Sequence, residues 1–169
     1  STSLKNSIIQ NWLIISILII AAILRFWNYW GFSLSNDELS ALNRTQFNSL
    51  KEMLWGGVWV DGHPAGVQIF LYYWVKVFGN SEAVIRFPFV LCGILSVFFA
   101  YKAASLWFSK GAGIFVAIVT GFLEFPLLYS NIARPYSPGL MFVMLQAWYW
   151  KKILTETEIN TKQKILNSV

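Results

Sequence analysis

The sequence predicts an all-α, polytopic membrane protein, and three observations lead to that fold class. Hydrophobic residues make up 56% of the 169 residues and charged residues only 12%, whereas an ordinary globular domain carries about 25% charge. The mean hydropathy is +0.53. The apolar residues also gather into runs near the length of about 20 residues that a helix needs to cross the hydrocarbon core of a bilayer.

The first span is predicted over about residues 7–30. No residue from Asn6 to Leu24 is ionisable, and aromatic residues follow Arg25. Aromatic side chains concentrate at the two membrane interfaces, so this group marks the far end of the span. No small-residue cleavage site follows the apolar run, which favours a retained span over a signal peptide.

Three further spans are predicted over about residues 83–108, 111–133 and 135–150. Arg86 lies just inside the second span, and Glu124 interrupts the third. Together with the first span they form an N-terminal transmembrane module, for which we expect the bounds 1–152. The polar residues 153–169 are then expected to form a cytoplasmic tail or linker.

Residues 31–82 separate the first two spans and contain one more apolar stretch, residues 64–75. This stretch is too short for an ordinary span and is typical of an interfacial or re-entrant segment. Charge gives an independent test, because cytoplasmic loops are enriched in Lys and Arg. If the stretch does not cross, seven such residues lie inside and five outside; if it crosses, the inside count falls to four. We therefore predict that residues 31–82 lie on the outer face and that both chain ends are cytoplasmic.

Two interfacial helices are expected in this outer loop. Ser35 and Glu38 have the spacing of a capping box, which starts a helix. The apolar positions that follow continue to Gly56-Gly57, where this helix should end. A second helix should begin at Pro64, a favoured first-turn residue, and end near Gly79.

Polar residues of the outer loop each allow a structural and a chemical interpretation. Asp37 and Glu38 stabilise a helix N-terminus by their charge, and the capping box is the favoured role of Glu38. Asp37 is not needed for that box and could accept a proton from an incoming hydroxyl group. Asp61 and His63 fit a turn before the second helix, and the chain has no second histidine and no zinc-binding spacing.

Three charged residues in or beside the spans are further candidates. Arg86 and Arg134 lie at the outer boundary, where arginine either extends to lipid headgroups or binds the phosphate of a lipid-linked substrate. Glu124 lies within the third span, where a carboxylate is costly and is either paired or functional. No basic run is dense enough for a nucleic-acid surface, so membrane lipids are the expected partners.

The order of these features resembles the N-terminal half of GT-C fold glycosyltransferases, the class that includes protein O-mannosyltransferases and lipid A aminoarabinose transferases. The resemblance covers about residues 8–150. It is carried by Asn36-Asp37-Glu38, by His63-Pro64, by Phe78-Gly79-Asn80-Ser81-Glu82-Ala83-Val84-Ile85-Arg86-Phe87-Pro88, and by Tyr129-Ser130-Asn131-Ile132-Ala133-Arg134-Pro135-Tyr136.

The resemblance implies two juxtamembrane helices in the first outer loop. It also implies a polyprenyl-phosphate sugar donor and inverting transfer to an acceptor hydroxyl on the non-cytoplasmic face. Asp37 would be the general base, with Glu38 beside it. His63 falls in a motif near the donor pocket, with Ala65 in place of a second proline. The remaining matches are Arg86 and Arg134, expected near the donor phosphate or holding the outer loop, and Tyr136.

The family resemblance leaves other expectations open. Residues Asn131-Ile132 replace a Gln-Glu pair that the family often has, and four spans are fewer than its conserved module contains. The chain is then either part of a longer enzyme or a relative that works with other membrane subunits. A non-catalytic subunit that keeps the fold for assembly or lipid binding is the alternative, and a transporter fragment ranks third. A bacterial inner membrane is the expected location. No cofactor is indicated, and nothing demands a divalent cation at Asp37 and Glu38.

Overall fold

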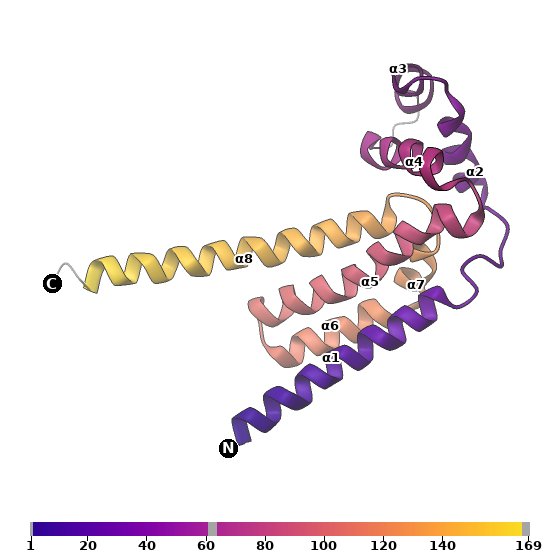
Figure 1. The fold of residues 1–169 in the computed structure, drawn as a ribbon. Coiled ribbons are helices and arrows are strands. Elements are labelled where there is room, and N and C mark those ends of the chain that lie inside the picture. Colours follow the sequence, from indigo (N-terminus) through magenta and orange to yellow (C-terminus); the bar gives the residue numbers. More distant parts are fainter. Residues whose placement is uncertain (1, 61–63, 167–169) are drawn as a thin grey trace.

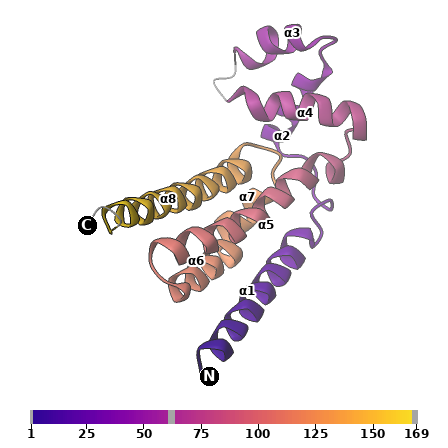
Figure 2. The ribbon, with the colours of Figure 1, turned by 60° about the vertical axis from the view of Figure 1, so that its left-hand side comes forward.

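The computed structural model describes residues 2–60 and 64–166 and contains helices throughout. Figure 1 shows α1, α5, α6 and α8 running side by side, with α2, α3 and α4 gathered at one end and both termini toward the other. Figure 2 shows the same arrangement from a second direction. The α-helices are α1 Thr2–Phe26, α2 Asn36–Asn43, α3 Leu50–Met53, α4 Ala65–Phe78, α5 Glu82–Trp107, α6 Lys110–Phe122, α7 Glu124–Ser130 and α8 Tyr136–Leu166.

The described part of the chain has the length and apolar composition of a polytopic membrane protein. Ile9–Phe26 of α1 and Glu82–Trp107 of α5 are each long and apolar enough to cross a bilayer, and α6 with α7 forms a third candidate span if the bent pair is counted as one. The all-α membrane fold is confirmed. The span at residues 135–150 stays a prediction, because the apolar part of α8 is short and α8 is not among these candidates.

The segment predicted as a span over residues 111–133 is not one straight helix, because α6 and α7 meet at an angle of 58°. Leu123 is extended at the break, with φ −63° and ψ 143°. Pro126 explains the break: it has no N–H to donate to the carbonyl of Phe122, and its ring would clash with that carbonyl in a straight helix. Glu124 therefore begins a new helix and is exposed there, not deep within a straight span.

Arg25 satisfies the carbonyl groups that this break leaves open. Its Nη1 donates to the carbonyl of Gly121 at 2.9 Å and its Nη2 to that of Thr120 at 3.0 Å. Nη1 also lies 3.3 Å from the carbonyl of Ala21, and the side chain is completely buried. A positive charge at the C-terminal end of α6 also interacts favourably with the helix dipole.

The helices approach closely where small residues face each other. A Cβ atom at Gly93 of α5 would lie 2.4 Å from Cβ of Ser130, and one at Gly113 of α6 would lie 2.9 Å from the carbonyl oxygen of Tyr101. Small residues let transmembrane helices pack at short range, where dispersion and interhelical contacts drive association. The core of the bundle lies between α1, α5 and α6, at Ile14, Ile17, Ala21, Val97, Ile114 and Ala117.

The layer formed by α2, α3 and α4 contains more breaks than the sequence predicted. The capping box at Ser35 and Glu38 is confirmed, but α2 ends at Asn43 and gives way to the 3₁₀ turn Arg44–Gln46, the short α3 and the π-helical turn Leu54–Val58. Polar residues cause the interruption: the Thr45 hydroxyl bonds to the carbonyl of Leu42 at 2.7 Å, and the Ser49 side chain starts α3 by accepting from the N–H of Glu52 at 3.2 Å.

The helix predicted between Pro64 and Gly79 forms as α4, and its interfacial position stays a prediction. Pro64 is the N-cap, and Gly79 ends the helix with φ +95°, a conformation open to glycine but strained for most other residues. A second buried cluster attaches this layer to the bundle, and it contains Ala41 of α2, Leu71 of α4, Ile85 and Phe89 of α5, and Ala133.

Helix α8 starts at the end of the bundle next to α2 and α4 and runs back beside α5. Its 31 residues correspond to about 46 Å at about 1.5 Å per residue. Near its middle, the indole N–H of Trp107 donates to the carbonyl of Ala147 at 2.9 Å, and the ammonium group of Lys102 lies 5.4 Å from the ring centre of Trp148. The helix continues to Leu166, so the described part of the predicted polar tail is helical in its backbone.

Candidate functional site

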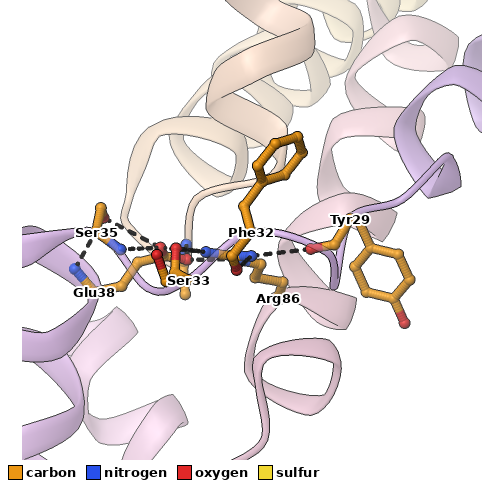
Figure 3. A network of polar contacts seen from close by, with 7 residues as sticks. Tyr29, Phe32, Ser33, Ser35, Glu38 and Arg86 are labelled. Carbon is orange, nitrogen blue, oxygen red and sulfur yellow. Dashed lines mark hydrogen bonds and ion pairs between the residues drawn. The ribbon is translucent and has the colours of Figure 1, made fainter.

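A buried ion pair joins the layer of α2, α3 and α4 to the bundle. Arg86, in the second turn of α5, donates from Nε to Oε1 of Glu38 and from Nη2 to Oε2, both at 2.8 Å. The side chains of Arg86 and Glu38 are only 5% and 1% exposed. This two-pronged geometry is the strong form of an arginine–carboxylate interaction. Figure 3 shows the pair with the loop that surrounds it.

The other donors of Arg86 hold the loop between α1 and α2. Nη1 donates to the carbonyl groups of Tyr29 at 3.0 Å and Phe32 at 2.9 Å, and Nη2 donates to that of Ser33 at 3.1 Å. A guanidinium group has five N–H donors, and these bonds, with the two to Glu38, use all five. In this arrangement Arg86 holds the loop between α1 and α2 and has no donor left for a lipid phosphate.

Both carboxylate oxygens of Glu38 also accept further hydrogen bonds. Its Oε1 also accepts from the backbone N–H of Ala133 at 3.0 Å, and its Oε2 accepts from the backbone N–H of Ser35 at 2.9 Å and the Ser35 hydroxyl at 3.1 Å. Burial by itself raises the pKa of a carboxyl group, but the hydrogen bonds from Arg86, Ser35 and Ala133 outweigh it, so the pKa of Glu38 lies below its ordinary value. Glu38 is therefore an ionised carboxylate that joins α2, α5 and the α7–α8 turn.

Asp37 lies next to this carboxylate in the chain but in a different environment. It is exposed in the first turn of α2, where the helix dipole favours its negative charge. The two neighbouring acids thus differ in environment: Glu38 is buried in the clamp with Arg86, and Asp37 is exposed one residue away.

Arg134 and Tyr136 follow directly after the residue that binds Glu38. Arg134 is 6% exposed and forms part of the wall of a small cavity together with Ala41 and Gln68. Gln68 is fixed there by donating to the carbonyl of Ala41 at 2.8 Å. Tyr136 opens α8, is 41% exposed and packs edge-on against Tyr129, with the ring centres 4.6 Å apart.

The remaining predicted residues lie apart from the clamp or outside the described structure. Asp61 and His63 are outside the described residues. Glu124 starts α7 and is exposed. Among the described residues, no three His, Cys, Asp or Glu side chains cluster closely enough to hold a metal ion.

Sequence reasoning missed one contributor to the site, Ala133, and one buried structural charge, Arg25. The backbone N–H of Ala133 donates to Glu38, 95 positions away in the chain. Every residue except proline has such an N–H group, so the residue type gives no sign of this contact. Arg25 also was not singled out, although an arginine beside a long run without ionisable residues is the kind of signal that indicates a buried structural or functional charge.

An apolar groove of about 590 Å³ lies between α4, α5 and α8. Its described wall consists of prolines, glycines, phenylalanines, a valine, a methionine and Cys92. It shares Pro64, Val67 and Pro135 with the small cavity beside Arg134, so the two hollows adjoin.

A family model described as dolichyl-phosphate-mannose-protein mannosyltransferase matches residues 62–163, more than half of the chain. The chain belongs to this family. The match confirms the GT-C glycosyltransferase relationship and extends from before α4 through most of α8, so it includes Arg86, Arg134 and the groove. Asp37 and Glu38 precede the matched segment of this mannosyltransferase family. Comparisons with curated proteins and with solved structures gave no match.

Proposed function

We propose that the protein acts as a membrane glycosyltransferase that moves a sugar from a polyprenyl-phosphate donor to an acceptor hydroxyl group on the non-cytoplasmic face. The observation that carries the proposal is the division between the two neighbouring acids of α2. Glu38 is buried in a clamp with Arg86, and Asp37 is exposed beside it. A general base needs both access to its substrate and a fixed position, and Asp37 has both.

The proposed chemistry is a direct displacement at the anomeric carbon of the donor sugar. Asp37 accepts the proton of the acceptor hydroxyl while the hydroxyl oxygen forms the new bond to that carbon. The bond between the carbon and the phosphate oxygen breaks, and polyprenyl phosphate leaves with the electron pair. Attack on the face opposite the leaving group inverts the anomeric configuration. A positive charge near the departing phosphate stabilises the negative charge that develops there.

Arg134 is the residue that best fits the role beside the donor phosphate. Arg86 directs its five donors at the protein itself, whereas Arg134 lies at the cavity that adjoins the apolar groove. Tyr136, partly exposed at the start of α8, lies two residues further along. His63 and Asp61 precede Pro64, which contributes to both hollows, and we keep them in the proposal as donor-side residues.

The distribution of Lys and Arg supports an outer location for α2, α3 and α4. The end of the bundle away from these helices carries Lys102, Lys110, Lys151 and Lys152, and both termini point toward that end (Figure 1). The enrichment of positive residues in cytoplasmic loops then places the termini inside, in the inner membrane if the source is bacterial.

The decisive experiment compares transfer by Asp37→Asn with that by Glu52→Gln, a variant of an exposed acid on α3 in the same layer. Membranes that contain the protein are supplied with a panel of labelled polyprenyl-phosphate sugars, and transfer to endogenous acceptors is measured. We expect Asp37→Asn to lose at least about a hundredfold in rate, the lower end of what a general base contributes, and Glu52→Gln to keep full activity. Full transfer by Asp37→Asn would contradict the role of Asp37 as base.

The alternative function is that of a non-catalytic membrane subunit. The family match begins after Asp37, so it does not include the proposed general base. A subunit of this kind would retain the clamp for assembly and carry out no transfer. If an active partner complex is isolated, unchanged transfer with Asp37→Asn but loss of assembly with Glu38→Gln would support the subunit role.

A further inference from the structure

We infer that a second site, at the end of the bundle away from α2, α3 and α4 (Figure 1), binds the phosphodiester headgroup of an anionic phospholipid. We call it the lysine–tryptophan site, and it consists of Lys102 and Trp107 of α5 with Trp148 and Lys151 of α8. None of these four residues belongs to the Glu38–Arg86 clamp or to the groove between α4, α5 and α8. The inference therefore goes beyond the proposed transfer reaction.

Each lysine of the site lies over an aromatic ring of the other helix. The ammonium group of Lys102 on α5 is 5.4 Å from the ring centre of Trp148 on α8. The ammonium group of Lys151 on α8 is 5.5 Å from the ring centre of Trp107 on α5. Both distances lie within the range of about 6 Å for cation–π attraction. Two positive charges are thus held at the junction of α5 and α8.

Both aromatic rings are fixed by further contacts. The indole N–H of Trp107 donates to the carbonyl of Ala147 at 2.9 Å. The ring of Trp148 stacks on that of Phe99, with the ring centres 6.0 Å apart. The lysines therefore rest on surfaces that are already in place, and a ligand loses little affinity to ordering the site when it binds.

The site carries positive charge without an acidic partner in the described part of the chain. Neither Lys102 nor Lys151 forms an ion pair there, whereas Lys152 lies 3.9 Å from Glu156. Lys102 and Lys151 are also partly buried, so water and salt screen their mutual repulsion less than at an exposed lysine such as Lys110. An aromatic face attracts a cation but does not neutralise it. The site therefore favours an anion that contacts both ammonium groups.

The two lysines are close enough to share one phosphodiester headgroup. Lys151 lies over Trp107, which follows Lys102 by five positions, or about 7.5 Å along α5. Lysine has a flexible stem and three N–H donors. A phosphodiester offers several acceptor oxygens, and its bonds to an ammonium group are of the strong, charge-assisted kind.

The level of the site along α5 favours a lipid over a soluble anion. Lys102 follows Glu82, the first residue of α5, by about 20 residues, which a helix covers in about 30 Å. That length equals the thickness of the hydrocarbon core. Tyr149 and Trp150 are exposed nearby on α8, and aromatic side chains of this kind concentrate at membrane interfaces. The site therefore lies at the level of the phospholipid headgroups.

An apolar stripe leads from the site toward the middle of the bundle. Leu95 and Leu91 precede Lys102 by about two and three helical turns, so the three residues share one face of α5. Both leucines are exposed. A phospholipid whose headgroup contacts Lys102 can lay an acyl chain along this face. A zwitterionic headgroup carries its own ammonium group, which competes with the lysines for the phosphate, so the site selects anionic phospholipids.

The test measures lipid binding to the full-length protein by native mass spectrometry, after lipids are removed in a neutral detergent. Phosphatidylglycerol and phosphatidylcholine with the same acyl chains are titrated separately. A basic residue near a membrane surface strengthens attraction to anionic lipid about fivefold. We therefore expect the first phosphatidylglycerol to bind at least about tenfold more tightly than the first phosphatidylcholine. Lys102→Gln combined with Lys151→Gln should abolish this preference.

The matched control removes two charges from the same end of the bundle but outside the site. It is Lys110→Gln combined with Lys152→Gln, since Lys110 is exposed and Lys152 is already paired with Glu156. This variant should keep the wild-type preference. Lys102→Arg combined with Lys151→Arg should keep it as well, because arginine retains the charge and also stacks on aromatic rings.

Three results would overturn the inference. Equal affinity of the wild type for the two lipids would remove the selectivity for an anionic headgroup. An equal loss in the Lys110 and Lys152 control would reduce the effect to net charge, with no site between α5 and α8. Displacement of bound phosphatidylglycerol by an equal concentration of inorganic phosphate would assign the ligand as a free anion.

Discussion

One carboxylate oxygen, Oε1 of Glu38, lies 2.8 Å from Nε of Arg86 and 3.0 Å from the backbone nitrogen of Ala133. These partners are 48 and 95 positions away in the sequence. A single buried oxygen thus connects α2, α5 and the turn that leads into α8.

Removing one member of this clamp should be far more damaging than removing both. Glu38→Gln leaves the Arg86 charge buried and unpaired, so we expect the free energy of unfolding to fall by about 3–5 kcal/mol. Glu38→Gln combined with Arg86→Met should recover part of that loss, because no buried charge remains. Thermal unfolding in detergent, arranged as a double-mutant cycle, measures the difference. Additive losses would mean that the two side chains do not act as a pair.

The pH dependence of stability should reflect Glu38. In the folded protein the pKa of Glu38 lies below its ordinary value. At a pH between the folded pKa and the unfolded pKa, the unfolded chain therefore binds more protons than the folded protein. Stability from this group is therefore complete above the unfolded pKa of about 4.3 and is lost as pH falls through the lower folded pKa. Unfolding temperatures measured from pH 7 down to pH 3 should fall in that acid range. Glu38→Gln should show a flatter profile, and an equal slope would assign the effect to other carboxylates.

Arg25 should be important for stability without touching the substrate. Arg25→Met leaves the carbonyl groups of Thr120 and Gly121 buried without their donors, at a cost of about 1–3 kcal/mol for each unsatisfied group. We expect a lower unfolding temperature and faster proteolysis near the α6–α7 break. Lys110→Gln, which removes an exposed charge at the start of α6, is the control and should behave as wild type. A stable Arg25→Met protein would show that water or lipid replaces the guanidinium group.

Close helix packing should make Gly93 intolerant of even one added carbon. Gly93→Ala brings a Cβ atom to 2.4 Å from Cβ of Ser130, and overpacking of this kind costs about 1–3 kcal/mol. Gly111→Ala adds the same methyl group where the nearest atom is 3.8 Å away and should not destabilise the fold. Unfolding temperatures of the two variants test the contrast. Equal stability would mean that α5 and α7 separate easily at this contact.

Local signals in the sequence predicted the parts of the fold that depend on neighbouring residues. The capping box at Ser35 and Glu38, and the limits of α4 at Pro64 and Gly79, follow from backbone preferences that act within a few residues. The same is true of the long apolar runs of α1 and α5.

Features that depend on distant contacts were not predictable in this way. The hydrophobic run from residue 111 to 133 suggested one helix, although Pro126 was available as a sign of the break. The full engagement of Arg86 depends on three carbonyl groups of the loop after α1. Sequence alone placed this arginine at the membrane boundary and could not decide whether its donors face a lipid phosphate or the protein.

The length of α8 has a mechanical consequence. At about 46 Å, its 31 residues exceed the hydrocarbon thickness of about 30 Å. One end, at Tyr136, adjoins Arg134 and the groove, and the other reaches beyond the lysines at 151 and 152. Because the helix is continuous, a rotation or tilt imposed at the far end moves the near end as well. A movement of the far end of α8 can therefore change the geometry of the site at its near end.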